Sequence, residues 1–210
     1  NHDSIREYIC NFIMSKLETN QVDPATGTTL TLGTSGDTIS IPSGVTIANS
    51  GTATGFGETN TPAFEAYLGG SGGQSLSNDA VTKIQFDTEV FDSDGTYDAS
   101  TNYRFTPGVA GKYFVYGMIQ YDTSGNDQLG PAYFYFKLNG STNVLELEKN
   151  PQTHYGRMNY TSGHAILDLS ASDYVEVYGR VNTVSGSGQL VESDSQYKRA
   201  SKFGAYRIIL

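Results

Sequence analysis

The sequence FDTEVFDSDGTYDASTNYRFTPGVAGKYFVYGMIQY, residues 86–121, decides the fold class. It holds two strand candidates, residues 103–106 and 113–121, separated by a turn that contains Pro107 and two glycines. Side chains of a strand alternate between the two faces of its sheet. The second candidate has large apolar side chains at odd and at even positions, so both of its faces need cover. One face can line the core between two sheets, and the simplest cover for the other is a second copy of the chain.

Five residues are the candidates for an interface between copies of the chain. The even positions of residues 113–121 form the second face of that strand, and two tyrosines alternate with phenylalanines in residues 133–138. Tyrosine combines apolar area with a polar tip, which suits protein interfaces and sugar stacking. Interface or core burial is favoured over a ligand platform, because strands that are apolar on both sides need burial first. The trimer-interface candidates are Phe114, Tyr116, Met118, Tyr133 and Tyr135.

A motif of the form FD…YD…Y-x-F-T-P…G-x-Y runs through the opening stretch. Its residues are Phe86, Asp87, Tyr97, Asp98, Tyr103, Phe105, Pro107, Gly111 and Tyr113. Together with the turn at 137–140, the strand at 173–177 and the closing strand at 203–210, it resembles the globular head of the complement C-one-q and tumour-necrosis-factor superfamily. The resemblance covers residues 61–210 and implies a jelly-roll β-sandwich that assembles as a tight homotrimer.

The Gly-, Ser- and Thr-rich lead-in resembles that of bacteriophage tail-fibre and virion proteins that carry such a head. The resemblance implies a non-enzymatic virion structural protein, outside the cell, whose trimeric head recognises a host receptor or glycan. Its N-terminal region would contact other virion proteins. Two alternatives remain open: a secreted or surface-attached bacterial adhesin or carbohydrate-binding module with the same head, and a capsid decoration protein.

Composition excludes several partners. The formal net charge is −9 over 210 residues, and no basic run occurs, which argues against nucleic acid. The single Cys10 cannot form an intrachain disulfide, so stability has to come from packing or assembly. No stretch approaches the roughly 20 apolar residues of a membrane span, so we expect no membrane insertion.

The first 60 residues divide into two parts. Residues 1–13 have mixed charges and a weak helical period, and two interpretations are open: a short helical anchor, or an over-extended reading frame upstream of a natural start at Met14. Residues 14–60 are predicted to be a β-repeat extension and a linker. Pairs of apolar residues recur there between the turns at 33–37 and 42–44, and three chains wound together could pool them, whereas a loose linker is the alternative. These pairs are Leu30 and Leu32, Ile39 and Ile41, and Val45 and Ile47.

Residues 61–210 are predicted to form an all-β jelly-roll head. The spacing of about nine short strands, without a convincing helix, is typical of a sandwich or jelly roll. The dipeptide Asn139-Gly140 is the strongest hairpin signal in the chain. The expected strands cover residues 63–68, 81–86 continuing to 91, 103–106, 113–121, 133–138, 144–147, 165–169, 174–181 and 203–210.

No motif of enzyme chemistry has its required context. Residues 69–73, GGSGG, match G-x-S-x-G, but a nucleophile elbow needs a helix after the serine, and none is predicted. The three histidines, His2, His154 and His164, lack metal-binding spacing. We therefore predict no catalytic residues, no cofactor and no metal site, and regard the protein as a non-enzyme.

The loop at residues 92–98 resembles part of a calcium loop. Asp92, Asp94 and Asp98 provide closely spaced carboxylates around Gly95, but the downstream bidentate glutamate is missing. Asp and Gly are also ordinary turn formers, and the turn interpretation is favoured over a bound ion.

Overall fold

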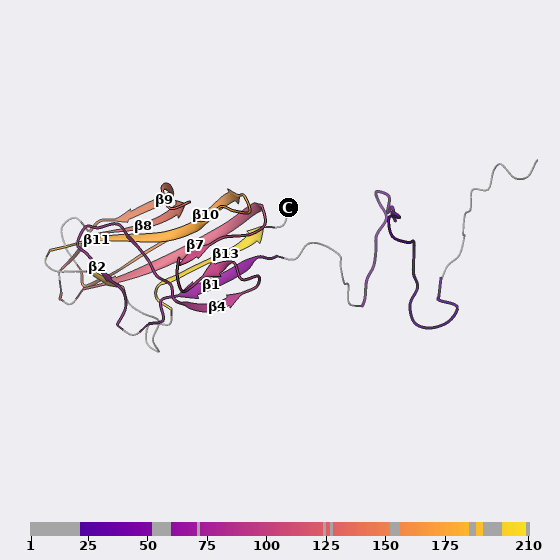
Figure 1. The fold of residues 1–210 in the computed structure, drawn as a ribbon, viewed down its shortest axis with the longest axis horizontal. Helices are drawn as coiled ribbons and strands as arrows, with labels where there is room; N and C mark the ends of the chain where they lie inside the picture. The colour runs from indigo at the N-terminus through magenta and orange to yellow at the C-terminus, as the bar shows by residue number, and fades with distance from the viewer. Residues whose placement is uncertain are drawn as a thin grey trace, which may run out of the picture. The chain divides into compact units, whose positions relative to one another are not determined.

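The computed structural model describes residues 22–51, 60–70, 72–123, 125–126, 128–151, 156–184, 188–190 and 199–208. Contacts divide the chain into two compact units, Asn1–Thr54 and Gly55–Leu210, and each is described by itself. The predictions for residues 1–13 and for Met14 lie outside the described residues. Within the described ranges the regular structure consists of strands only, all of them in the second unit (Figure 1).

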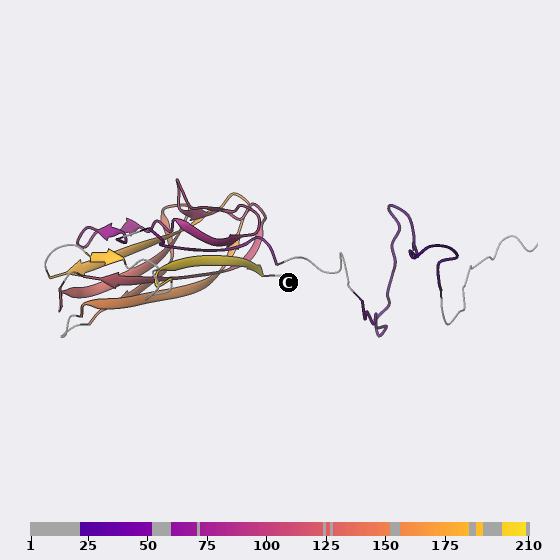
Figure 2. The same cartoon turned by 90° about the horizontal axis from the view of Figure 1, so that it is seen from below.

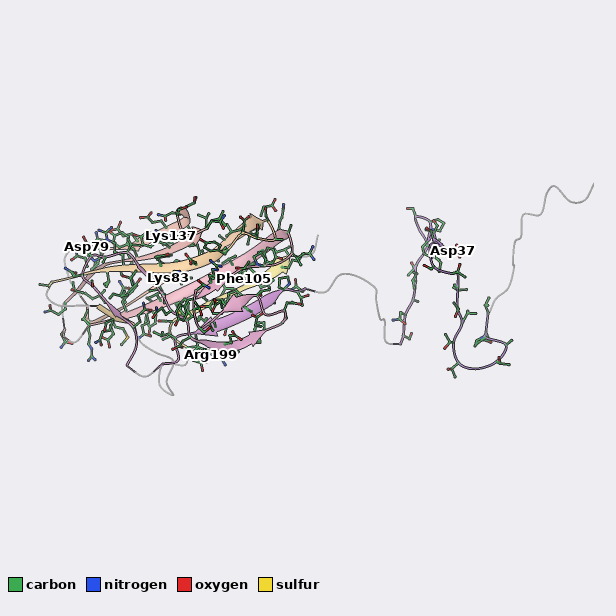
Figure 3. All side chains as sticks on the ribbon, viewed as in Figure 1. Asp37, Asp79, Lys83, Phe105, Lys137 and Arg199 are labelled. Carbon is green, nitrogen blue, oxygen red and sulfur yellow. The ribbon has the colours of Figure 1, made fainter. Side chains whose placement is uncertain are left out.

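The described part of the first unit, residues 22–51, contains turns but no strand ladder. The amide of Asp37 donates to the carbonyl of Thr34, and the Asp37 carboxylate accepts the amide of Thr34 at 2.7 Å (Figure 3). A second turn is closed by a bond from the Val45 amide to the Pro42 carbonyl. Both predicted turns are therefore present. The six apolar side chains of the predicted repeat are 43–62% exposed in the single chain, as expected where two apolar residues per segment cannot form a core alone.

The larger sheet of the head, sheet A, has seven strands. Its strands run in the order β2-β12-β7-β13-β1-β4, and β10 pairs with β7 along the whole length of β7. All of these pairs are antiparallel. Figure 1 shows β10, β7, β13, β1 and β4 side by side. The bounds are β1 Ala63–Tyr67, β2 Ser75–Leu76, β4 Thr88–Asp92, β7 Gly111–Asp122, β10 Met158–Leu169, β12 Gly188–Leu190 and β13 Lys202–Ile208.

The second sheet, sheet B, has six antiparallel strands that pack across the core from sheet A (Figure 2). Its order is β5-β6-β11-β8-β9, with β3 pairing to β11. The bounds are β3 Thr82–Lys83, β5 Tyr97–Asp98, β6 Arg104–Phe105, β8 Leu129–Leu138, β9 Thr142–Lys149 and β11 Val175–Thr183. Two antiparallel sheets around one core confirm the predicted all-β sandwich.

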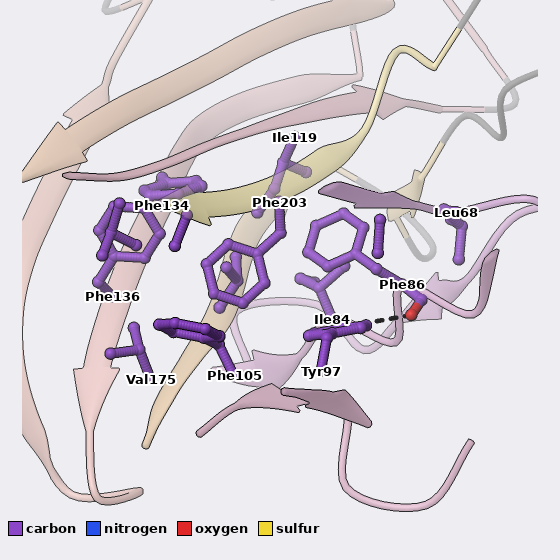
Figure 4. Packing of buried hydrophobic residues seen from close by; sticks show 14 of the residues in the cluster. Leu68, Ile84, Phe86, Tyr97, Phe105, Ile119, Phe134, Phe136, Val175 and Phe203 are labelled. Carbon is purple, nitrogen blue, oxygen red and sulfur yellow. Dashed lines mark hydrogen bonds between the residues drawn. The ribbon is translucent and has the colours of Figure 1, made fainter. Parts of the chain in front are cut away.

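Aromatic rings fill the centre of the core. Phe64 stacks on Tyr97 and on Phe105, with centroids 4.6 and 4.9 Å away, and Phe203 meets Phe64 edge-on at 5.0 Å. The Tyr97 hydroxyl donates to the carbonyl oxygen of Phe86 at 3.0 Å (Figure 4). Full burial of one such ring contributes about 1.5–3 kcal/mol. The cluster therefore joins sheet A to sheet B near the motif quoted from the sequence.

The hairpin predicted at Asn139-Gly140 is confirmed. Asn139 and Gly140 have φ of 52° and 73°, the left-handed values of the two central positions of a type I′ turn, and the Ser141 amide closes this turn to the Leu138 carbonyl. They connect β8 to β9, which pair from Leu138↔Thr142 onward. The Asn139 side chain also bonds to Asp173 and to the amide of Tyr174, which fixes the turn against the start of β11.

Two strand predictions were wrong in detail. Residues 81–91 do not form one strand: β3 belongs to sheet B and β4 to sheet A, and the buried Ile84 and Phe86 line the crossing between them. The prediction for residues 165–169 covered only the second half of β10. The first half was missed because its inward side chains include the polar Asn159 and Thr161, which break the apolar alternation.

Candidate functional site

Strand β7 has two faces, as its sequence predicted. The inward side chains are fully buried between the sheets: Tyr113, Val115, Ile119 and Tyr121. The outward side chains lie on the outer face of sheet A and are only partly buried: Phe114, Tyr116 and Met118. The surface that the sequence marked for a partner is therefore an outer sheet face, not a part of the core.

One row of apolar side chains crosses this outer face. Tyr206 of β13 pairs with Phe114 of β7, and Phe114 pairs with Ile166 of β10. Ala63 of β1 continues the row beside Tyr206. The rings of Phe114 and Tyr206 are 5.3 Å apart, and Ile166 is 64% exposed. Because paired residues point to the same face, Ala63, Tyr206, Phe114 and Ile166 form one continuous surface, called the apolar row below.

Tyr116 lies beside the apolar row and is held by its own protomer. Its ring covers Gly204 so closely that a Cβ there would be 2.4 Å from the ring. Its hydroxyl donates to Oε2 of Glu65 at 2.9 Å, and Arg199 and Lys202 flank the same carboxylate. Burial, followed by the bond to Glu65, raises the pKa of Tyr116 above its usual value. Tyr116 therefore belongs to an internal polar network at the edge of the apolar row.

Tyr133 and Tyr135 lie on the opposite side of the sandwich. On β8 the intervening Phe134 and Phe136 point into the core and are fully buried. The two tyrosines point to the outer face of sheet B and stack on each other at 6.2 Å. The five interface candidates thus fall on two different outer faces, and their place in an interface stays a prediction.

Charged residues and tyrosines pair within the chain on the outer face of sheet B. Lys83 forms an ion pair with Glu176, whose side chain is 3% exposed. The Tyr178 hydroxyl donates to Glu176 at 3.1 Å, and the ammonium of Lys137 lies 4.6 Å from the Tyr178 ring (Figure 3). Both lysines therefore have partners inside the same protomer.

The two arginines of this sheet are paired in the same way. Arg180 bonds to Asp79, with Nη2 to Oδ1 at 2.7 Å, and its guanidinium lies 4.7 Å from the Tyr133 ring. Arg104 lies 4.2 Å from the ring of Tyr174. Cation–π contacts of this kind contribute about 0.5–1 kcal/mol where exposed. The face is polar and internally matched, in contrast to the apolar row on sheet A.

The acidic loop after β4 uses its carboxylates to form turns. Asp92 accepts bonds from the amides of Asp94 and Tyr97. Asp98 accepts bonds from Thr101 and neighbouring donors, and these hold its pKa well below the usual range. Among the described residues no group of three or more His, Cys, Asp or Glu is placed to hold a metal ion. The geometry matches the turn interpretation of this loop.

The other sequence motifs do not converge on a reactive site. The described glycines of residues 69–73 lie in the loop between β1 and β2, and Ser71 lies outside the described residues. His164 stacks on Phe114 at 5.5 Å, on the outer face of sheet A, while His2 and His154 lie outside the described residues. In the described ranges no helix is long and apolar enough to cross a membrane.

Sequence reasoning named only part of the apolar row. It named Phe114, but Tyr206 and Ile166 lay unremarked within two predicted strands. A signal was available for Ile166, because it lies between two apolar, partly buried neighbours on its own strand, Ala165 and Leu167. What the sequence could not give is the register that puts the three side chains in one line.

Three solved structures are similar to this chain over most of its length. The globular domain of the zebrafish complement 1qA protein is 17% identical, with 70% of this chain and 96% of that chain covered and a TM-score of 0.49. The tumour necrosis factor Eiger from S. frugiperda is 16% identical over 71% and 94%, with a TM-score of 0.49. Murine APRIL at pH 5.0 is 14% identical over 70% and 99%, with a TM-score of 0.48. No family model matches the chain, and no curated protein matches it.

Proposed function

We propose that this chain is a non-enzymatic attachment protein of a virion, a tail fibre or spike. Its sandwich head would assemble as a homotrimer and bind a host-surface receptor or glycan, and its N-terminal region would form a stalk that contacts other virion proteins. The proposal places the protein on the virion, outside the cell.

The observation that carries the proposal is the apolar row. A continuous apolar row that is open in the single chain favours a partner, because monomeric proteins rarely expose large contiguous apolar patches. In a symmetric assembly each copy would offer the same row. A homotrimer is the state implied by the resemblance of residues 61–210 to the complement and tumour-necrosis-factor heads.

The extension supports a fibre in the same way. Its six apolar side chains are exposed in the single chain, and in a trimer three copies of each pair could meet along a common axis. Attachment through loops on the head, with a stalk behind it, would separate binding to the host from binding to the virion.

Light scattering on the purified full chain tests the assembly. We expect a trimer at micromolar concentration, with an interface in the obligate range of about 2,000–5,000 Å². A folded monomer under these conditions would contradict the proposal. Immunogold labelling of virus particles from the source culture tests the location: labelled fibres or spikes support it, and labelled cells without particles would favour the cellular adhesin instead.

A further inference from the structure

A surface hollow of about 330 Å³ lies where the end of β1, β2, the crossing from β3 to β4 and the loop before β6 come together. Its lining includes Leu68, Gln74, Gln85, Asp87 and Tyr103. The wall is tied together by Gln74, whose amide donates to the carbonyl of residue 83 and accepts the amide of residue 85. The volume falls within the range of small-ligand sites, which are usually preformed.

Tyr103, in the wall of this hollow, has a strained backbone. Its φ of +50° lies in the left-handed region, where a bulky residue is an outlier and where Gly or Asn is the usual choice. Such strain persists only where the surrounding structure imposes it, and it gathers at functional sites. A large ring at a position that favours glycine therefore needs a reason.

The neighbours of Tyr103 impose this conformation. On one side Asn102 is fixed by Asp98, which accepts its amide at 3.1 Å and its side chain at 2.7 Å, and by Lys83, which donates to its carbonyl at 3.2 Å. On the other side Phe105 is fully buried in the core. The loop is anchored at both ends, and the result is that the Tyr103 side chain lines the hollow.

Polar groups in the hollow remain available to a ligand. Asp87 uses Oδ1 to accept the amide of Gly69 and the hydroxyl of Thr88. Within the described part of the chain, Oδ2 of Asp87 and the hydroxyl of Tyr103 form no hydrogen bond. Gln85 adds an exposed amide at the rim. A carboxylate, an amide and an aromatic ring together suit a partner with many hydroxyl groups and an apolar C–H face.

The charge of the region limits the ligand further. A second hollow of about 500 Å³ shares Asp87 and is lined by Glu89 and Asp98 as well. No lysine or arginine is among the described residues that line either hollow. Sialylated, sulfated and phosphorylated ligands would therefore be repelled.

We propose that this hollow binds an uncharged saccharide, with Tyr103 as the stacking surface and Asp87 as the hydroxyl acceptor. The inference rests on the proposed attachment function and names its ligand class. The neighbouring hollow would hold a second sugar unit, and the strained Tyr103 marks the position where stability is given up for binding.

A panel of immobilised oligosaccharides probed with the full chain tests the proposal. Neutral glycans should bind, and sialylated or sulfated glycans should not. Asp87→Asn keeps the shape of the side chain and removes its charge. Tyr103→Asn removes the ring and introduces a residue that tolerates the left-handed backbone. Each substitution should weaken glycan binding about tenfold or more. Tyr103→Asn should also unfold at no lower temperature than the unmodified protein, because the strain is relieved.

Two matched controls separate this hollow from the rest of the surface. Asp94→Asn removes a carboxylate from a different hollow, lined also by Pro107 and Arg207. Tyr160→Asn removes an exposed tyrosine from β10. Both should bind neutral glycans as the unmodified protein does. The inference is overturned if no neutral glycan binds, if charged glycans or basic peptides bind instead, or if Asp87→Asn and Tyr103→Asn bind normally.

The test also separates this inference from the proposed function. A full chain that binds neutral glycans through Asp87 but stays a monomer would support the site and contradict the trimeric fibre. If the Asp87→Asn and Tyr103→Asn variants form trimers that adhere to host cells as well as the unmodified protein does, attachment is supported and this site is overturned.

Discussion

The two outer faces of the sandwich differ in what contacts their large side chains. Each carries a row of large side chains that the core does not cover. On sheet B the tyrosines are matched by cations of the same protomer, such as Lys137 over Tyr178 and Arg180 over Tyr133. On sheet A no cation among the described residues stacks on a ring of the row Tyr206–Phe114–Ile166, although Lys112 pairs with Asp168 beside it, and Ile166 is mostly exposed.

The presence or absence of matching polar groups beside the rings indicates which face needs a partner. Stacking of a cation on a ring, and its pairing with a carboxylate, satisfies a surface that faces water. An apolar row gains nothing from water and is stabilised only when it is covered. Aromatic content alone therefore does not identify an interface, because the polar groups beside the rings decide whether the chain has already used them.

The largest expected effect comes from placing a charge on each face in turn. Phe114→Asp puts a carboxylate in the apolar row, where burial in an assembly would cost several kcal/mol. We expect the trimer to dissociate, with a dissociation constant raised by about 100-fold or more. Tyr133→Asp, on sheet B, is the matched control and should leave the trimer intact. Sedimentation velocity measures the oligomeric state of both variants. If the trimer survives Phe114→Asp and is lost in Tyr133→Asp, the interface lies on sheet B and not on sheet A.

The second effect tests the internal pairing of sheet B. Lys83→Met leaves the nearly buried Glu176 carboxylate without its cation. Removing one partner of a buried pair costs about 3–5 kcal/mol, and we expect about 2 kcal/mol here because the Lys83 side chain is 31% exposed. The control Lys112→Met breaks an exposed pair with Asp168 on sheet A and should cost less than about 1 kcal/mol. Urea unfolding measures both, and equal losses would contradict the contrast between the faces.

A third effect tests the polar network beside the apolar row. Gly204→Ala places a methyl group 2.4 Å from the Tyr116 ring, so the ring has to leave its position over the strand. Overpacking of this kind costs about 1–3 kcal/mol. In a Tyr116→Ala background the same change should cost almost nothing, since the obstructing ring is gone. A double-mutant cycle in chemical denaturation measures the coupling, and additive losses would mean that Tyr116 does not lie over Gly204 in solution.

The sequence predicted the elements of this comparison better than their arrangement. The apolar residues at odd and even positions of β7 predicted a two-faced strand, and Asn139-Gly140 predicted the β8–β9 hairpin, because both signals are local. Alternation does not say which sheet a strand joins. Tyr133 and Phe114 therefore seemed to mark one interface, although they lie on different sheets.

The missed strands have a related cause. β2 and β5 are two residues long, and their residues are ordinary loop residues in isolation. They become strands only through pairing with β12 and β6. The strain at Tyr103 was hidden for a similar reason, because one of the bonds that impose it comes from Lys83 on another strand, in addition to the local bonds that Asp98 accepts from Asn102.

The smallest expected effect compares one tyrosine from each face. Burial, and then the Glu176 carboxylate, raise the pKa of Tyr178 from 10.0 to about 12. Burial and Glu65 raise the pKa of Tyr116 as well. In the unfolded chain both tyrosine hydroxyls lose their protons near pH 10, whereas in the folded protein they keep them at that pH. The folded state thus binds more protons above that pH, so this part of the stability is complete below pH 10 and is lost as the pH rises toward the folded pKa.

Melting temperatures at about pH 8 and about pH 11 measure this loss. Tyr178→Phe and Tyr116→Phe should each reduce the alkaline fall, by no more than about 3 °C for a chain of this size. The two reductions should be about equal, because both folded tyrosines have a pKa above about 11 and keep their protons at that pH, while the unfolded chain loses both. An alkaline fall that neither substitution changes would contradict the contacts of both tyrosines with their carboxylates.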